Sequence, residues 1–60
     1  MSAVVVSHID TYHMVIFGRR TRLFRLTVRR AGLVVEQSVH ISRRAARDCA
    51  SAAVEFYAHG

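Results

Sequence analysis

Residues 22–30 read RLFRLTVRR and form the clearest strand signal in the chain. Apolar and polar side chains alternate along this stretch, which is the pattern of a strand with one face in a core and one face in water. The apolar face comprises Phe24, Leu26 and Val28, and the polar face comprises Arg25, Thr27 and Arg29. We therefore expect a sheet whose arginine-bearing face stays open to solvent.

The segments on either side predict further strands. Residues 3–9 and 12–17 are rich in β-branched and aromatic side chains, which favours either two strands or one bent strand. Residues 18–21 predict a turn, because its glycine can adopt a positive φ. Residues 30–32 predict a second tight turn, and residues 33–41 an antiparallel return strand.

The return strand also alternates. One expected face comprises Leu33, Val35, Gln37, Val39 and Ile41, and the other comprises Val34, Glu36, Ser38 and His40. Because side chains on paired strands meet across the sheet, we expect Glu36 or Ser38 to contact the arginines opposite.

A helix is predicted over residues 43–59, with Ser42 as its N-cap. Its expected apolar stripe comprises Ala45, Ala46, Cys49, Ala53 and Phe56. The sequence therefore predicts an α+β fold in a single domain, residues 1–60. The expected architecture is a three- to four-stranded antiparallel sheet with one C-terminal helix on its Phe24 face.

Size and composition limit what this domain can be. Its 60 residues are 52% hydrophobic, with one cysteine and no proline. A core this small is marginal, and one cysteine cannot form an intramolecular disulfide, so self-association or a tight partner is expected. The apolar residues 4–6 and 14–17 either form a homodimer interface or join the core. No signal peptide or membrane span is recognisable, so we expect an intracellular protein without membrane contact.

The net charge of +5 is concentrated in one part of the chain. Residues 19–47 hold all nine basic residues, every one an arginine, against the single acid Glu36. Such a segment attracts polyanions. The use of arginine alone reflects either a GC-rich genome or the fit of the guanidinium group to phosphates and guanine edges.

Two arginine clusters are candidate binding sites. One follows the predicted strand face, because a β-ribbon fits the major groove of DNA; the alternative is a solvated face that blunts aggregation. The other lies at the helix start, where cations oppose the macrodipole, and indicates either an anion site or arginines that the fold tolerates. The predicted anionic-partner site comprises Arg19, Arg20, Arg22, Arg25, Thr27, Arg29, Arg30, Arg43, Arg44 and Arg47.

No pattern in the sequence predicts catalysis or a cofactor. His8, His13, His40 and Cys49 lack the spacing of metal ligands, and Cys49 is expected to be a buried inert thiol. Paired carboxylates, a glycine-rich phosphate loop and a convincing triad are not recognisable. We expect neither an enzyme nor a cofactor.

Residues 24–32, followed by residues 39–46, resemble part of a known DNA-binding architecture. The likeness is to AP2 domains and to the arm-type-site-binding domains of tyrosine recombinases, which combine three strands with one helix. The resemblance implies that the sheet lies in the major groove, with Arg25, Thr27 and Arg29 at groove-facing positions. It departs at the helix start, where arginines replace the usual acidic residues.

Two functions are therefore expected. The first is a small basic DNA-binding module encoded by a phage or another mobile element. The alternative is a phage-encoded inhibitor that binds a host protein or nucleoprotein complex, as anti-CRISPR proteins do. Duplex DNA is the leading partner, and RNA or an acidic protein surface remains open.

Overall fold

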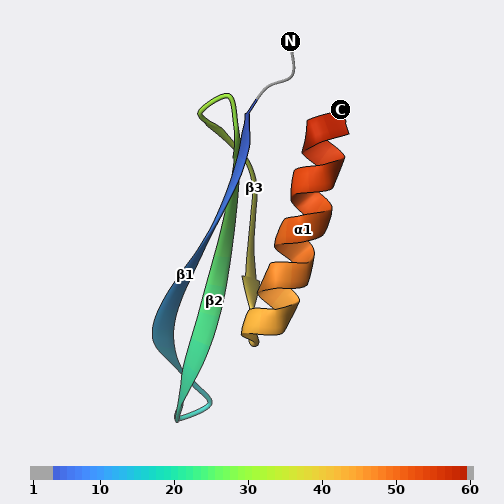
Figure 1. The fold of residues 1–60 in the computed structure, drawn as a ribbon. Coiled ribbons are helices and arrows are strands. Elements are labelled where there is room, and N and C mark those ends of the chain that lie inside the picture. Colours follow the sequence, from blue (N-terminus) through green and yellow to red (C-terminus); the bar gives the residue numbers. More distant parts are fainter. Residues whose placement is uncertain (1–3, 60) are drawn as a thin grey trace.

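The computed structural model describes residues 4–59 and confirms the predicted α+β fold. Three antiparallel strands in the order β1-β2-β3 are followed by one helix that lies across one face of the sheet (Figure 1). The elements are β1 (Val5–Ile16), β2 (Arg19–Arg30), β3 (Leu33–His40) and α1 (Arg43–His59). Ala3, the first residue of the predicted N-terminal strand, lies outside the described residues.

The two predicted N-terminal segments form one continuous strand. β1 pairs with β2 along its whole length, from Val5 opposite Arg30 to Ile16 opposite Arg19. The predicted turn over residues 18–21 is wrong in its extent. The loop contains only Phe17 and Gly18, because pairing continues up to Ile16 and Arg19. Residues 19–21 therefore belong to β2.

Both hairpin loops have the same unusual backbone. Phe17 and Gly18 have φ values of 52° and 74°, and Ala31 and Gly32 have values of 53° and 81°. Positive φ at both central residues is the signature of a type I′ turn, whose twist matches that of the strands it joins. Glycine takes this conformation freely, whereas the Cβ atoms of Phe17 and Ala31 make it costly.

The core lies between the middle strand and the helix. Leu26 and Val28 are completely buried and pack against Ala50 and Ala53 of α1. Because alanine side chains are short, the helix lies close to the sheet. Partly buried side chains complete this cluster, namely Val5, Ile9, Cys49 and Tyr57.

The predicted apolar stripe of the helix is confirmed at Ala46 and Ala53 and is wrong at Ala45 and Phe56. The buried residues are Ala46, Ala50 and Ala53. Ala45 is exposed, and Phe56 is 71% exposed. A stripe that runs 46, 50, 53 and 57 along the helix satisfies its 3.6-residue period and turns Phe56 away from the sheet.

The N-cap of α1 is confirmed. The Ser42 hydroxyl oxygen accepts a hydrogen bond of 3.1 Å from the backbone N–H of Ala45. This bond satisfies one of the N–H groups that the first turn leaves without a partner. Within residues 4–59, no helix combines the length and apolar character needed to cross a membrane.

A β-bulge changes which side chains of β3 share a face. Val28 lies opposite Glu36, but its neighbour Arg29 lies opposite Val34, so Val35 is the extra residue. The predicted grouping is therefore wrong at the start of β3. Val34 lies on the face away from α1, because one extra residue reverses the alternation.

The expected contacts between β3 and the arginines are also wrong. Glu36 and Ser38 lie opposite Val28 and Leu26, on the face that the helix covers. The residue opposite Arg25 is Val39. The helix thus covers the polar face of β3 and leaves its apolar face open.

The turn geometry predicts that asparagine stabilises both loops. Asparagine tolerates the left-handed region because its side chain hydrogen-bonds locally, whereas other non-glycine residues there cost roughly 1–2 kcal/mol. Phe17→Asn and Ala31→Asn should each raise the free energy of unfolding by about 1 kcal/mol. Thermal unfolding should then show a melting temperature higher by roughly 4–8 °C.

Thr21→Asn is the control for this prediction. It places the same residue inside β2, where asparagine is unfavourable, and should lower the melting temperature. A drop in melting temperature for either turn variant would contradict the assigned turn type.

Candidate nucleic-acid interface

The arginines of β2 are divided between its two faces. Because Leu26 and Val28 pack against α1, the even-numbered residues of this strand lie on the helix side. Arg20, Arg22 and Arg30 therefore lie on the helix side, and Arg19, Arg25 and Arg29 on the opposite side, here called the open face. The predicted binding residues thus do not form one surface.

Arg25 on the open face is already engaged within the protein. One of its terminal nitrogens lies 3.8 Å from a carboxylate oxygen of Asp10, and its guanidinium carbon lies 5.3 Å from the ring centroid of Tyr12. The other carboxylate oxygen of Asp10 is 2.7 Å from His8 Nε2. Exposed ion pairs are weak, but this one partly neutralises the charge predicted to contact a polyanion.

Thr27 lies on the predicted face but is not free to bind. Its side chain is only 9% exposed, and its hydroxyl accepts a hydrogen bond of 3.3 Å from Gln37 Nε2. His8 is its partner on β1. Thr27 therefore serves to pack the centre of the sheet, which the alternating sequence did not reveal.

Apolar side chains surround the open-face arginines. Val6 and Val34 lie opposite Arg29, and Val39 lies opposite Arg25. All three valines are more than half exposed. Of the predicted apolar N-terminal segments, Val5 packs against the core, whereas Met14, Val15 and Phe17 are exposed. The core thus leaves most of residues 14–17 uncovered.

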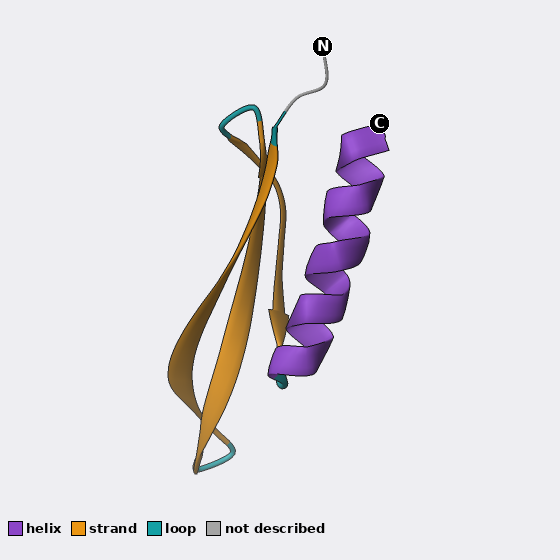
Figure 2. Cartoon of the chain, viewed as in Figure 1, coloured by secondary structure: helices purple, strands orange, loops and turns teal. Residues whose placement is uncertain are grey.

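The end of the β1–β2 hairpin projects beyond the rest of the fold. β3 stops pairing at His40, opposite Phe24, so residues 13–22 pair only with one another. We call residues 13–22 the hairpin arm. Figure 2 shows its turn lying beyond the start of the helix. The hairpin arm carries Arg19 on one face, Arg20 and Arg22 on the other, and no acidic residue.

Of the three arginines at the helix start, Arg43 and Arg47 lie against the sheet. The guanidinium carbon of Arg43 lies 5.7 Å from the ring centroid of Phe24. Arg43 and Arg47 line a small cavity of about 230 Å³ together with Ile9 and Thr11. Arg44 is exposed and lines neither cavity described here. The three therefore do not converge on one anion site as predicted.

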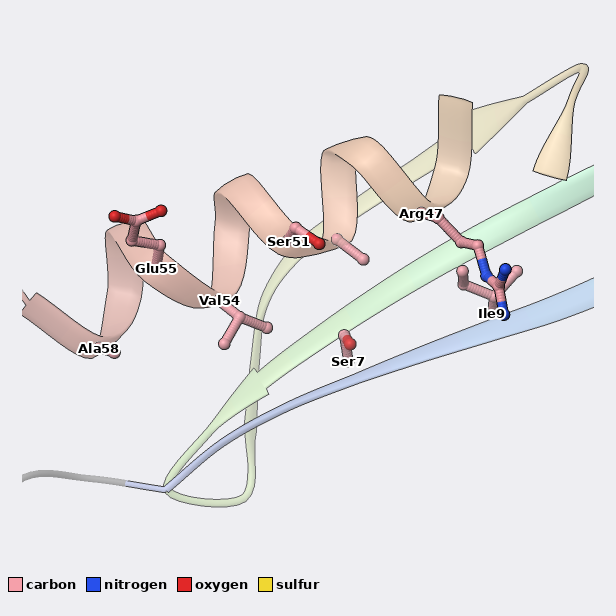
Figure 3. A pocket seen from close by; sticks show the side chains of 8 residues that line it. Ser7, Ile9, Arg47, Ser51, Val54, Glu55 and Ala58 are labelled. Carbon is pink, nitrogen blue, oxygen red and sulfur yellow. The ribbon is translucent and has the colours of Figure 1, made fainter. Parts of the chain in front are cut away.

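A larger groove of about 620 Å³ continues along the junction of α1 and β1. Figure 3 shows Arg47 reaching from α1 toward Ile9 on β1 at one end of this groove, and Glu55 near the other end. The remaining lining residues are Ser7, Ala50, Ser51, Val54 and Ala58. The groove is wide open, and its floor is mostly apolar.

These positions create a basic strip on the helix side of the sheet. Phe24 follows Arg20 and Arg22 in the same row of β2, and Arg43 lies over its ring. Arg47 continues the row toward Ile9. We call Arg20, Arg22, Arg43 and Arg47 the helix-side strip. Among residues 4–59, Arg25 is the one arginine paired with a carboxylate, so the strip's charges are uncompensated by ion pairs.

A chain of polar side chains lies between β3 and α1. Ser38 Oγ lies 2.8 Å from His40 Nε2 and 3.9 Å from Cys49 Sγ, and Cys49 Sγ donates a bond of 3.9 Å to Glu36 Oε2. Cys49 is half-buried, in contrast to its predicted full burial. Neither of the two cavities is lined by these residues.

Of the three candidate histidines and Cys49, only His40 and Cys49 lie close together within residues 4–59, because both contact Ser38. His8 lies on the open face, His13 on the hairpin arm, and His40 at the end of β3. In the part of the chain that the structure describes, no group of three His, Cys, Asp or Glu side chains could hold a metal ion.

Phe17 is prominent in the structure, whereas the sequence indicates it only as one of the apolar residues 14–17. It is fully exposed, at 104% of its reference area, and it occupies the tip of the hairpin arm. The available signal was the pair Phe-Gly between two strands, directly before two arginines. The pattern of residues 12–17 predicts Phe17 as the end of a strand, and the turn predicted over residues 18–21 starts at Gly18.

In comparisons with protein families, curated proteins and solved structures, no match to this chain was found. The resemblance to AP2 domains and recombinase arm-binding domains therefore stays a prediction.

We expect Tyr57 to make stability sensitive to alkaline pH. Its hydroxyl oxygen lies 3.2 Å from the Val35 carbonyl oxygen and 3.4 Å from Glu36 Oε1, so its single proton is shared between these two acceptors. Desolvation, followed by the charge of Glu36 and the hydrogen bond to it, raises the pKa of Tyr57 above 10.0. The neutral phenol is thus favoured in the folded state, and its contribution to stability is lost as the pH rises above 10.

Tyr57→Phe should therefore show a shallower loss of unfolding free energy above pH 10 than the wild type, measured by urea unfolding across that range. Glu36→Gln removes one cause of the pKa shift and should give an intermediate slope. Equal slopes for all three proteins would contradict this role of Tyr57.

Proposed function

We propose that this chain is a small, non-enzymatic module that binds duplex DNA. The observation that carries the proposal is the helix-side strip, whose four guanidinium groups lack carboxylate partners within residues 4–59. Arginine side chains gathered in this way suit the phosphates of a nucleic acid, because each forms charge-assisted hydrogen bonds with oxyanions.

The shape of the hairpin arm favours a duplex over other polyanions. A two-stranded antiparallel ribbon fits the major groove of DNA, and other β-ribbon proteins place their strands in the minor groove. The arm carries arginines on both faces, so a ribbon in a groove would present guanidinium groups toward both walls. Arg43 and Arg47 lie behind the arm and extend the contact toward the phosphates that flank the groove.

The open face supports DNA binding less strongly than the sequence suggested. Within residues 4–59, Arg25 is paired with Asp10 and Thr27 is covered, which leaves Arg29 as the member of the predicted trio without such a contact. We therefore assign the main contact to the helix-side strip and the hairpin arm.

A salt titration tests this assignment. The logarithm of the binding constant should fall linearly with the logarithm of the salt concentration, with a slope of about −0.9 per phosphate contacted. Arg20→Gln combined with Arg22→Gln should weaken binding to all duplex sequences alike and make the slope shallower by about 2. Fluorescence anisotropy with a labelled duplex measures both quantities.

Arg25→Gln combined with Arg29→Gln is the matched control. It removes the same net charge from the open face. It should change the slope of the salt dependence by less than Arg20→Gln combined with Arg22→Gln, here called the arm variant. The reverse ranking would move the interface to the open face. Absence of wild-type binding at low salt would overturn the proposed function.

The alternative function, an inhibitor that docks on a host protein, is favoured by one separate observation. The open face presents exposed valines beside its arginines, and apolar side chains next to arginine are typical of protein interfaces. Val34 and Val39 lie next to Arg29 and Arg25 across the sheet. A second copy of the chain could occupy the same surface.

Val34→Asp combined with Val39→Asp separates these occupants. If a host protein docks there, a partner retained after nuclease treatment should bind the wild type and the arm variant but not the valine variant. If a second copy docks there, analytical ultracentrifugation should show a wild-type dimer and a valine-variant monomer. A partner captured equally by all three proteins would contradict docking at the open face.

A further inference from the structure

The tip of the hairpin arm contains a side chain that works against the stability of the fold. Phe17 has a φ of 52° and is fully exposed. The backbone of a bulky residue is strained in the left-handed region. An exposed benzyl group also contributes no hydrophobic free energy to folding. The second loop has the same backbone but carries only the methyl group of Ala31 there. The fold therefore has no internal need for an aromatic ring at this position.

The surroundings of Phe17 point to a partner that is both anionic and able to receive an aromatic ring. Arg19 and Arg20 follow it on opposite faces of the hairpin arm, and Arg22 lies further back. At about 3.3 Å per residue, the arm extends about 16 Å from its base to its tip. Cationic side chains are thus distributed along the arm and are not gathered in one plane.

We propose that Phe17 is a wedge that inserts between stacked base pairs of duplex DNA from the minor groove and kinks the duplex. This inference rests on the proposed DNA-binding function and adds to it a mode of binding. Apolar side chains at the ends of DNA-binding elements act in this way, unstacking a base step and bending the helix by about 20–90°. Arg19 and Arg20 then lie beside the phosphates that flank the opened step, and Arg22 follows the groove.

The distribution of charge favours DNA over an anionic membrane. A bilayer presents its phosphates in one surface layer, which suits cations gathered at a single depth. The arm carries its arginines at several depths, and Arg43 and Arg47 lie deeper still, behind its base. A duplex offers phosphates at all these depths, because its two backbones follow both walls of the groove.

The experiment compares Phe17→Asn with its matched variant Ala31→Asn. Both place asparagine at the first position of the same type of turn, so both should fold at least as well as the wild type. Each protein is titrated into a duplex of about 30 base pairs, long enough to report a bend. Fluorescence transfer between labelled ends measures bending, and 2-aminopurine placed along the duplex measures unstacking.

We expect the wild type and Ala31→Asn to bend the duplex and to raise 2-aminopurine fluorescence at the inserted step. Phe17→Asn should lose both signals and bind on the order of tenfold more weakly, the usual loss when one aromatic contact to a base is removed. Its salt dependence should be unchanged, because no arginine is altered.

The outcomes separate the wedge from the proposed function. If Phe17→Asn binds and bends the duplex as Ala31→Asn does, the wedge is wrong while DNA binding stands. If the wild type fails to bind any duplex at low salt, both proposals are wrong. If the wild type, but not Phe17→Asn, sediments with vesicles of phosphatidylcholine and phosphatidylserine and neither bends DNA, Phe17 is a membrane anchor and the wedge is overturned.

Discussion

The packing of Leu26 and Val28 against the alanines of α1 is the contact on which the rest of the structure depends. β2 is the only described strand with a partner on both sides, and its two completely buried residues pack against the helix. Burying each such side chain contributes about 1.5–3 kcal/mol, a large share of the stability of so short a chain. The alanine stripe makes this possible, because larger residues would lift the helix from the sheet.

The limited reach of this core explains where the exposed groups lie. β1 and β2 each have 12 residues, whereas β3 has 8. The helix and β3 cover the same part of the long hairpin, so the remainder projects without support. Side chains on that remainder contribute little to folding. Folding therefore does not restrict which residues occupy these positions, and selection for binding another molecule can determine them. Three arginines and a phenylalanine lie in this part of the chain.

Local patterns in the sequence predicted most of the fold. The alternation of residues 22–30 predicted which residues of β2 face the helix, and Ser42 predicted the first residue of α1. The bulge at Val35 was not predictable, because one extra residue leaves no mark on composition and reverses the faces only at the start of β3. Both Phe56 and Tyr57 suit the end of an apolar stripe, and only contact with the sheet decides which of them packs against the core.

The candidate site was less predictable than the fold, for a related reason. Alternation places Arg25 and Thr27 on the open face, but it does not reveal that Asp10 and Gln37 reach them from neighbouring strands. Those contacts depend on register between strands. The helix-side strip likewise joins residues of β2 to residues of α1 that lie more than twenty positions later in the sequence.

The unsupported hairpin arm also has a consequence for motion. Within residues 4–59, no third strand pairs with the arm, and the start of the helix contacts the sheet behind the arm's base, so we expect the arm to open locally while the body stays folded. Its amide hydrogens should then exchange with solvent at a much lower free energy than those of Leu26 and Val28. A partner that binds the arm must hold it in one conformation, which lowers the conformational entropy of the arm and weakens binding. A more rigid arm would therefore bind more tightly without any new contact.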